Sequence, residues 1–385
     1  MQLPAPTPDA LDFSAALVRR IAAEIVAADG WIGFDHFMEL ALYAPGQGYY
    51  SGGAHKFGAA GDFVTAPELG PAFAQALATQ VAQLLALSAP AIIEVGAGSG
   101  QLASDLLREL ERRDALPASY AILELSGELQ ARQRQTLAAD VPHLLPRVDW
   151  LERLPERFDG LVLANEVLDA MPVKLVRWDA TGVAERGVAV ASGQFTWVDR
   201  PASGRLRECA QALAGECALP AGYLSEVSLA ARAWVAEWAA IVGRGALLLI
   251  DYGFPRREYY HWQRDAGTLM CHYRHHAHAE PFYLPGLQDI TAHVDFTAIV
   301  ESGCEAGFEL LGYCTQSSFL FNCGLTEILA RTPANDPRRY LPLAGAVNKL
   351  VSPAEMGELF KVMALGKGVS APLLGFASGD RSATL

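Results

Sequence analysis

The sequence predicts an α/β protein built on a doubly wound, mostly parallel sheet. The first observation is an apolar run at 91–95 that ends in a glycine-rich turn and continues into a helical stretch. The second is that strand-like and helix-like runs alternate after it, which implies a parallel sheet with helices on both faces. The third is size: 385 residues, half of them apolar, suffice for one large domain with insertions or for two domains.

The N-terminal segment is expected to be mostly helical. Apolar residues recur at every fourth position between Phe13 and Ile25, which predicts an amphipathic helix. We expect helices at 11–29, 34–43 and 68–87, and a loop rich in glycine and proline at 45–67. Long loops within compact domains are often functional. Residues 1–88 are therefore expected to form a helical segment that precedes the main domain, residues 89–385.

The alternating section is expected to supply the sheet. We expect strands at 91–95, 119–124, 148–151, 160–164, 245–250, 307–313 and 360–366, and helices at 100–113, 127–138, 227–241 and 294–305. Two insertions interrupt the alternation. The first, at about 173–226, opens with strand-like runs typical of a β-meander, and the second, at about 252–290, is irregular and rich in aromatic residues and histidine.

The composition excludes several classes of function. The net charge is −13 and no block of lysine or arginine is present, which argues against nucleic acid as a partner because phosphate neutralisation requires clustered cations. No apolar run reaches membrane-spanning length, and the N-terminus lacks the pattern of a secretory signal. The six cysteines form no CxxC pair, which is typical of a reducing compartment in a chain of this length. The expected location is cytoplasmic.

The glycine-rich turn indicates the ligand. Gly96, Gly98 and Gly100 follow the first strand directly, and glycines let the backbone approach a ligand that any Cβ would block. The dinucleotide fingerprint would place its third glycine at position 101, which is Gln101. This departure points away from NAD and toward S-adenosylmethionine.

Acidic residues stand at the ends of three predicted strands. Glu94, Glu124 and Glu166 would line the ligand crevice of an open α/β sheet. Carboxylates repel a phosphorylated ligand but suit one with a ribose, an amino group and a sulfonium. Glu124 can accept hydrogen bonds from both ribose hydroxyls, unless it is a solvated carboxylate at a strand end. Glu94 contacts the ligand or caps the amides of the glycine turn, and the sequence leaves both readings open.

A second polar constellation follows the fourth strand. Asn165, Glu166 and Asp169 lie within one turn of each other at the expected mouth of the crevice. Asn165 is also well suited to cap a following helix. Capping and function are compatible, and we favour a functional role for Glu166 and Asp169.

The motifs and their order resemble the MidA family of class I S-adenosylmethionine-dependent methyltransferases. Besides the glycine turn, the resemblance rests on residues 43–50, 61–68, 122–126, 164–173, 249–253, 267–269, 288–296 and 360–366. It implies the class I methyltransferase fold, a Rossmann-like doubly wound sheet, mostly parallel with an antiparallel last strand. Eukaryotic members are mitochondrial factors for respiratory complex I assembly that dimethylate an arginine. The resemblance therefore implies methylation of an arginine in a protein, with a respiratory complex subunit as one candidate substrate.

The resemblance also assigns roles to residues. An N-terminal flap over the cofactor would include Gly61, Asp62, Thr65 and Glu68. Cofactor contacts would come from Glu94, Gly96, Gly98, Gly100, Glu124, Leu125 and Asn165. Asn165, Glu166 and Asp169 would face the reactive methyl group, and His293, Asp295 and Phe296 would lie near the substrate entrance. Asp295 could instead be an acid favoured by a helix N-terminus.

Two departures qualify the resemblance. Met270 stands where the family usually has a basic residue, and the loop 272–278 is richer in histidine than expected. No carboxylate or cysteine pair near those histidines has ligand spacing, so no metal is expected. Three rival functions remain: a cofactor-binding assembly chaperone with little catalysis, a methyltransferase for a small molecule, and a nicotinamide oxidoreductase. The sequence leaves the oligomeric state open, with a homodimer as one option.

Overall fold

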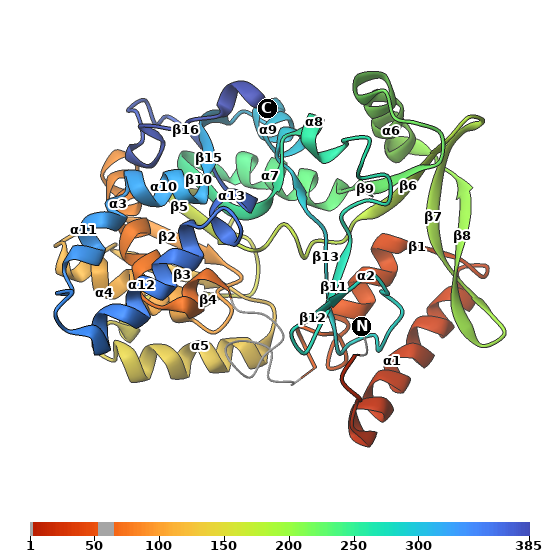
Figure 1. Cartoon of the computed structure of the whole chain (residues 1–385), viewed down its shortest axis with the longest axis horizontal. Helices are drawn as coiled ribbons and strands as arrows, with labels where there is room; N and C mark the ends of the chain where they lie inside the picture. The colour runs from red at the N-terminus through yellow and green to blue at the C-terminus, as the bar shows by residue number, and fades with distance from the viewer. Residues whose placement is uncertain (1–2, 53–64) are drawn as a thin grey trace. The chain divides into compact units, whose positions relative to one another are not determined.

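The computed structural model describes residues 3–52 and 65–385. The chain divides into two compact units, and their elements are labelled in Figure 1. The sheet unit comprises Val64–Val167, Trp234–Phe254 and Phe296–Leu385. The insertion unit comprises Met1–Phe63, Leu168–Ala233 and Pro255–Asp295, so it joins the N-terminal segment to most of both insertions.

The sheet unit contains the predicted mixed sheet. Its strands are β2 (Ala91–Val95), β3 (Ser119–Leu123), β4 (Val148–Leu151), β5 (Phe158–Asn165), β10 (Val242–Phe254), β15 (Glu309–Thr315) and β16 (Phe360–Lys367). They are arranged in the order β15-β16-β10-β5-β2-β3-β4. The pairings among β2, β3, β4, β5 and β10 are parallel, whereas β16 is antiparallel to both β10 and β15. The predicted fold class and its antiparallel last strand are confirmed.

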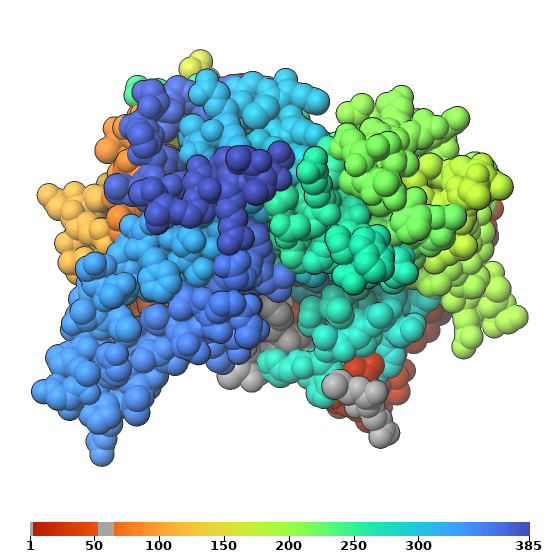
Figure 2. All heavy atoms as spheres, turned by 45° about the horizontal axis from the view of Figure 1, so that its top comes forward, coloured from red at the N-terminus to blue at the C-terminus, as the bar shows by residue number. Residues whose placement is uncertain are grey.

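Helices surround this sheet in Figure 1. They are η1 (Ala66–Leu69), α3 (Ala72–Leu87), α4 (Gln101–Arg112), α5 (Gly127–Asp140), η2 (Leu145–Arg147), α7 (Leu229–Ile241), α9 (Phe296–Glu305), α10 (Gln316–Asn322), α11 (Leu325–Ala330), α12 (Pro337–Val351), α13 (Met356–Leu359), η3 (Leu374–Phe376) and η4 (Ser382–Thr384). The predicted helix at 68–87 is wrong at its start, because Gly70 has a φ of 131° and Pro71 precedes α3. Figure 2 shows α11 and α12, in blue, at the surface of this unit.

The insertion unit is organised around an antiparallel sheet. It contains α1 (Pro8–Ala27), β1 (Ile32–Gly33), α2 (Phe34–Tyr43), β6 (Lys174–Asp179), β7 (Gly182–Ala191), β8 (Gln194–Pro201), α6 (Gly204–Cys217), β9 (Tyr223–Val227), α8 (Arg256–Tyr259), β11 (Met270–Tyr273), β12 (His276–His278), β13 (Asp289–Thr291) and β14 (Val294–Asp295). The sheet order is β1-β7-β6-β9, with β8 paired to β7, which contains the predicted meander. The predicted helix at 227–241 starts two residues later, because Val227 pairs with Lys174 of β6. The stretch predicted to be irregular contains the small sheet β12-β11-β13.

The register of the parallel strands gathers the site residues at one edge of the sheet. Val95 pairs with Leu123 on one side and with Ala164 on the other. The segments that follow β2, β3 and β5 therefore leave the sheet side by side. These segments begin with Gly96, Glu124 and Glu166, and a crevice outside the carboxyl ends of parallel strands is where open α/β sheets bind ligands.

Candidate active site

The glycine turn after β2 divides into an open part and a packed part. Gly96, Gly98 and Gly100 have φ values of 64°, 54° and 84°, a region that side chains with a Cβ rarely adopt. Gly96 is exposed and Gly98 is half-buried, so their backbone is accessible to a ligand. Gly100 is buried, and a Cβ there would lie 3.0 Å from the Cα of Gln133 in α5. Gly100 therefore allows α5 to pack close to the start of α4.

Glu94 is the acidic residue of β2 and is 2% exposed. The Tyr120 hydroxyl donates a hydrogen bond of 2.6 Å to its Oε2. Burial raises the pKa of Glu94 to about 7; the hydrogen bond from Tyr120 lowers that pKa and the charge of Glu124 raises it. The Glu94 carboxylate thus binds the side chain of Tyr120 and does not cap the glycine turn.

Glu124 follows β3 and is held by two donors. Its Oε1 accepts a hydrogen bond of 2.9 Å from the backbone N–H of Ser126, and its Oε2 accepts one of 3.0 Å from Gln133 Nε2. The residue is 8% exposed, so it is not a freely solvated carboxylate. Leu125, next in the chain, is 82% exposed and leaves an apolar side chain at the same edge of the sheet.

The segment before α3 contacts the glycine turn. The Ser99 hydroxyl donates a short hydrogen bond to Glu68 in η1, and the same hydroxyl accepts one of 3.3 Å from the backbone N–H of Gln101. Thr65 immediately precedes η1. The other two residues predicted for the flap, Gly61 and Asp62, lie outside the described residues.

The end of β5 has an unusual backbone. Glu166 is in the left-handed region, with a φ of 53°, and its N–H donates a hydrogen bond of 2.8 Å to the Ile250 carbonyl. Asn165 Nδ2 donates a hydrogen bond of 3.1 Å to Glu166 Oε1. No helix begins between residues 166 and 172, all of which are described, so the predicted capping role of Asn165 is wrong. Non-glycine residues in this conformation are concentrated at functional sites.

In the insertion unit, Asp169 lies among aromatic and acidic residues. It is buried, and its charge contributes to the raised pKa of Tyr50, for which burial is the largest cause. The Tyr50 hydroxyl donates to both carboxylate oxygens of Asp289, at 3.0 and 3.2 Å. The Tyr43 ring stacks on Tyr50 with centroids 5.4 Å apart. Carboxylates beside aromatic faces form a suitable environment for a planar cation.

The residues predicted at the substrate entrance occupy three different environments. The backbone N–H of His293 donates a hydrogen bond of 3.0 Å to Thr268 Oγ1. Asp295 Oδ2 lies 3.6 Å from Arg256 Nε. Phe296 is fully buried in the sheet unit and packs against the Tyr313 ring, with centroids 5.3 Å apart. His293 and Asp295 are half-buried, whereas Phe296 is buried.

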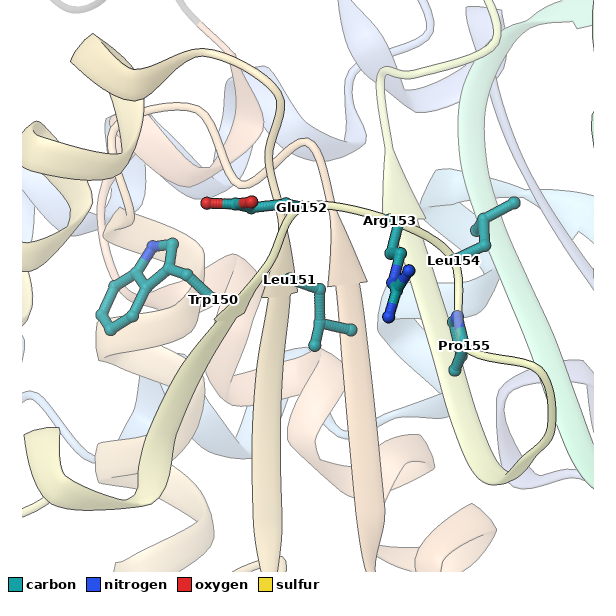
Figure 3. Close-up of a pocket in the computed structure, with 6 residues that line it drawn as sticks. All are labelled: Trp150, Leu151, Glu152, Arg153, Leu154 and Pro155. Atoms are coloured by element: carbon teal, nitrogen blue, oxygen red, sulfur yellow. The ribbon is translucent and has the colours of Figure 1, made fainter.

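A cavity of about 520 Å³ opens at the end of β4. It is lined by Trp150, Leu151, Glu152, Arg153, Leu154 and Pro155. Figure 3 shows this segment leaving β4 and crossing in front of the neighbouring strands toward β5. Its lining combines aromatic and aliphatic surface with one carboxylate and one guanidinium, and such a mainly apolar lining with a few polar groups suits a flat heterocycle.

Sequence reasoning missed several residues that organise the site. Tyr120 and Gln133 donate hydrogen bonds to the predicted residues Glu94 and Glu124, and Trp150 lines the cavity. Tyr50, whose pKa is raised in part by the charge of Asp169, donates to Asp289. Glu226 accepts hydrogen bonds from the N–H groups of Thr268 and Leu269. One of them had a signal in the sequence. Gln133 stands between Leu129 and Leu137 in the buried stripe of α5, where a polar residue is out of place.

The histidine-rich loop forms the hairpin of β11 and β12. Burial lowers the pKa of His272 and also that of His278. Within residues 3–52 and 65–385, the structure contains no group of three or more His, Cys, Asp and Glu side chains placed to hold a metal ion. In the same described ranges, no helix combines the length and the apolar character needed to cross a membrane.

Comparisons with known proteins agree on one family. A family model described as "Putative S-adenosyl-L-methionine-dependent methyltransferase" matches residues 73–314. The mitochondrial protein arginine methyltransferase NDUFAF7 of Danio rerio is 28% identical over 383 residues, which cover 90% of this chain and 86% of that protein. The NDUFAF7 homolog of Drosophila melanogaster is 27% identical over 416 residues, which cover 94% of this chain and 89% of that homolog. A solved structure from Burkholderia thailandensis, bound to S-adenosyl-homocysteine, is 55% identical, with a TM-score of 0.96 and full coverage of both chains.

Proposed function

Because this chain belongs to the family of S-adenosyl-L-methionine-dependent methyltransferases, we propose that it transfers a methyl group from S-adenosylmethionine to an arginine side chain of a protein. The observation that carries the proposal is the edge of the sheet where β2, β3 and β5 end. There an open glycine backbone and a fixed carboxylate stand side by side.

The described residues fit the cofactor. The accessible backbone at Gly96 and Gly98 has room for the methionine part, because no Cβ covers it. Glu124 would accept the ribose hydroxyls, since its two oxygens are fixed by donors from the protein. Leu125 and the cavity at the end of β4 would hold the adenine ring. When bound, the cofactor supplies an activated methyl group with a neutral thioether as leaving group.

The protein's own contribution is to orient the nucleophile. A guanidinium is protonated at neutral pH, so it attacks best when carboxylates fix its planar fork and draw its charge away from one nitrogen. Glu166 and Asp169 are the residues proposed for this role. Orientation of this kind is worth about 7–11 kcal/mol of activation free energy in well-placed reactions.

The choice of arginine in a protein is supported by the names of the relatives and by the chemistry around Asp169. The NDUFAF7 proteins of Danio rerio and Drosophila melanogaster are named protein arginine methyltransferases. Within the insertion unit, Asp169, Tyr50 and Asp289 form a carboxylate-rich aromatic cluster of the kind that holds a guanidinium. A subunit of a respiratory complex is the proposed class of substrate, and the cytoplasm is the proposed location.

The test is transfer of a labelled methyl group. Purified protein is incubated with methyl-labelled S-adenosylmethionine and cell extract, and labelled proteins are hydrolysed for amino-acid analysis. We expect labelled methylarginine. Label in small molecules alone would favour a small-molecule methyltransferase, and binding of the cofactor without transfer would favour an assembly chaperone. The exposed residue Glu305 in α9 offers a control, because Glu305→Ala should transfer methyl groups as the wild type does.

A further inference from the structure

Gln133 is a fully buried polar residue in the middle of α5. It occupies the central position of the stripe that α5 buries, with Leu129 one turn before it and Leu137 one turn after. Burying an amide is unfavourable unless every polar atom finds a partner. A leucine at this position would serve the packing of the helix, so packing alone does not account for the amide.

The Gln133 amide makes three hydrogen bonds to three different segments. Its Nε2 donates to Glu124 Oε2 at 3.0 Å and to the carbonyl oxygen of Gly98 at 3.1 Å. Its Oε1 accepts from Trp150 Nε1 at 2.9 Å. The partners fix the orientation of the amide, because two of them are acceptors and the indole N–H is only a donor.

The three partners belong to the three segments assigned above to different parts of the cofactor. Gly98 lies in the open part of the glycine turn, Glu124 is the ribose carboxylate, and Trp150 lines the cavity at the end of β4. Trp150 is itself covered by Arg134 of the same helix, whose guanidinium carbon lies 3.6 Å from the ring centroid. One buried amide therefore connects the binding surfaces for the methionine, ribose and adenine parts.

We propose that Gln133 is a positioning residue that sets the orientation of the Glu124 carboxylate for the ribose hydroxyls. This inference rests on the proposed function, because it assumes that Glu124 binds the ribose. The Ser126 N–H fixes one carboxylate oxygen and the Gln133 amide fixes the other. With both oxygens held, the carboxylate cannot rotate about its terminal bond, so its plane keeps one direction. Gln133 thus acts on ribose recognition, and it does so without contact with the cofactor.

The test compares two ligands, S-adenosylhomocysteine and its 2′-deoxy analogue, by calorimetry. Wild-type protein should prefer the ribose ligand by about tenfold or more, the value of one good hydrogen bond to a charged group. The variant Gln133→Met keeps the length and packing of the side chain but lacks the donors. It should bind S-adenosylhomocysteine about tenfold more weakly and lose most of its preference between the two ligands. A purely structural role would weaken both ligands equally and leave the preference unchanged, which would overturn the proposal.

Gln130→Leu is the matched control. Gln130 lies one turn earlier in α5 and donates to the backbone carbonyl of Glu124, at 2.8 Å, not to its carboxylate. Its variant should keep the wild-type preference for the ribose ligand. If Gln133→Met is not recovered folded, Trp150→Phe decides: it removes the N–H that orients the amide, and it should also reduce the preference. An unchanged preference in Trp150→Phe would then contradict the proposal.

The variant Glu124→Gln separates failure of this inference from failure of the proposed function. If Glu124→Gln abolishes the preference and Gln133→Met retains it, the ribose site is correct and the role of Gln133 is wrong. If wild type and Glu124→Gln bind both ligands alike, Glu124 does not bind the ribose and the proposed cofactor site itself fails.

Discussion

Replacement of the buried Glu94 by glutamine should remove a pH dependence of stability. Burial raises the pKa of Glu94 in the folded state to about 7, from an ordinary value of 4.5. Between these two pH values the folded protein holds a proton that the unfolded chain has released. The free energy of unfolding therefore falls as the pH rises through this window, by about 3 kcal/mol in total at about 1.4 kcal/mol per pH unit.

The variant Glu94→Gln keeps an oxygen that accepts the hydrogen bond from Tyr120 but cannot ionise. Its stability should equal that of the wild type near pH 4.5 and exceed it by about 3 kcal/mol at pH 8. Urea unfolding, followed by tryptophan fluorescence at a series of pH values, measures the difference in the free energy of unfolding between the two proteins. The contributions of titratable groups that both proteins share cancel in this difference. The exposed Glu128 in α5 supplies the control, because Glu128→Gln should differ little from wild type at any pH.

A difference between Glu94→Gln and wild type that stays constant from pH 5 to pH 8 would contradict a raised pKa of Glu94 in the folded protein. It would mean that the carboxylate is ionised throughout, and that charged or polar partners compensate its burial. The same titration repeated with S-adenosylmethionine tests the link to function. A bound sulfonium favours the ionised carboxylate, so the ligand should reduce the difference above pH 7.

Four further substitutions test the cofactor site, the residues that orient the nucleophile and the packing of the sheet. Gly98→Val should abolish binding of S-adenosylhomocysteine in a folded protein, and calorimetry that shows unchanged affinity would contradict the site. Glu166→Ala and Asp169→Ala should each lower turnover by roughly a hundredfold while cofactor affinity stays within about threefold. A variant that keeps wild-type turnover would show that the replaced residue has no role in the mechanism. Gly245→Ala should destabilise the protein by about 3 kcal/mol or more, because the φ of Gly245 is 151° and the added Cβ would overlap the Gly160 carbonyl oxygen. Urea unfolding measures the effect. A loss of less than about 0.5 kcal/mol would show that β10 and β5 can move apart to admit the methyl group.

The core of the fold was predictable because its signals are local. The apolar run at 91–95, the three glycines after it and the amphipathic helix that follows specify one strand–turn–helix unit, and its observed bounds agree within a residue. The helices between β15 and β16 were not predicted. Their longest member, α12, contains Pro342, a residue that normally indicates the end of a helix.

The strand-end acids were predictable, but their environments were not. The positions of Glu94 and Glu124 could be predicted because each residue stands at the end of an apolar run that forms a strand. The protonation of Glu94 depends on burial, and the orientation of Glu124 depends on Gln133, which lies nine residues further on and reaches it through the packing of α5. The left-handed backbone of Glu166 also depends on tertiary contacts, because its N–H is bound by β10.

The most direct test of the central claim is a crystal structure of this protein with S-adenosylhomocysteine. We expect the ligand at the carboxyl ends of β2, β3 and β5, with both ribose hydroxyls on Glu124 and the amino-acid part over Gly96 and Gly98. A ligand bound elsewhere, or a ribose that does not touch Glu124, would contradict this expectation.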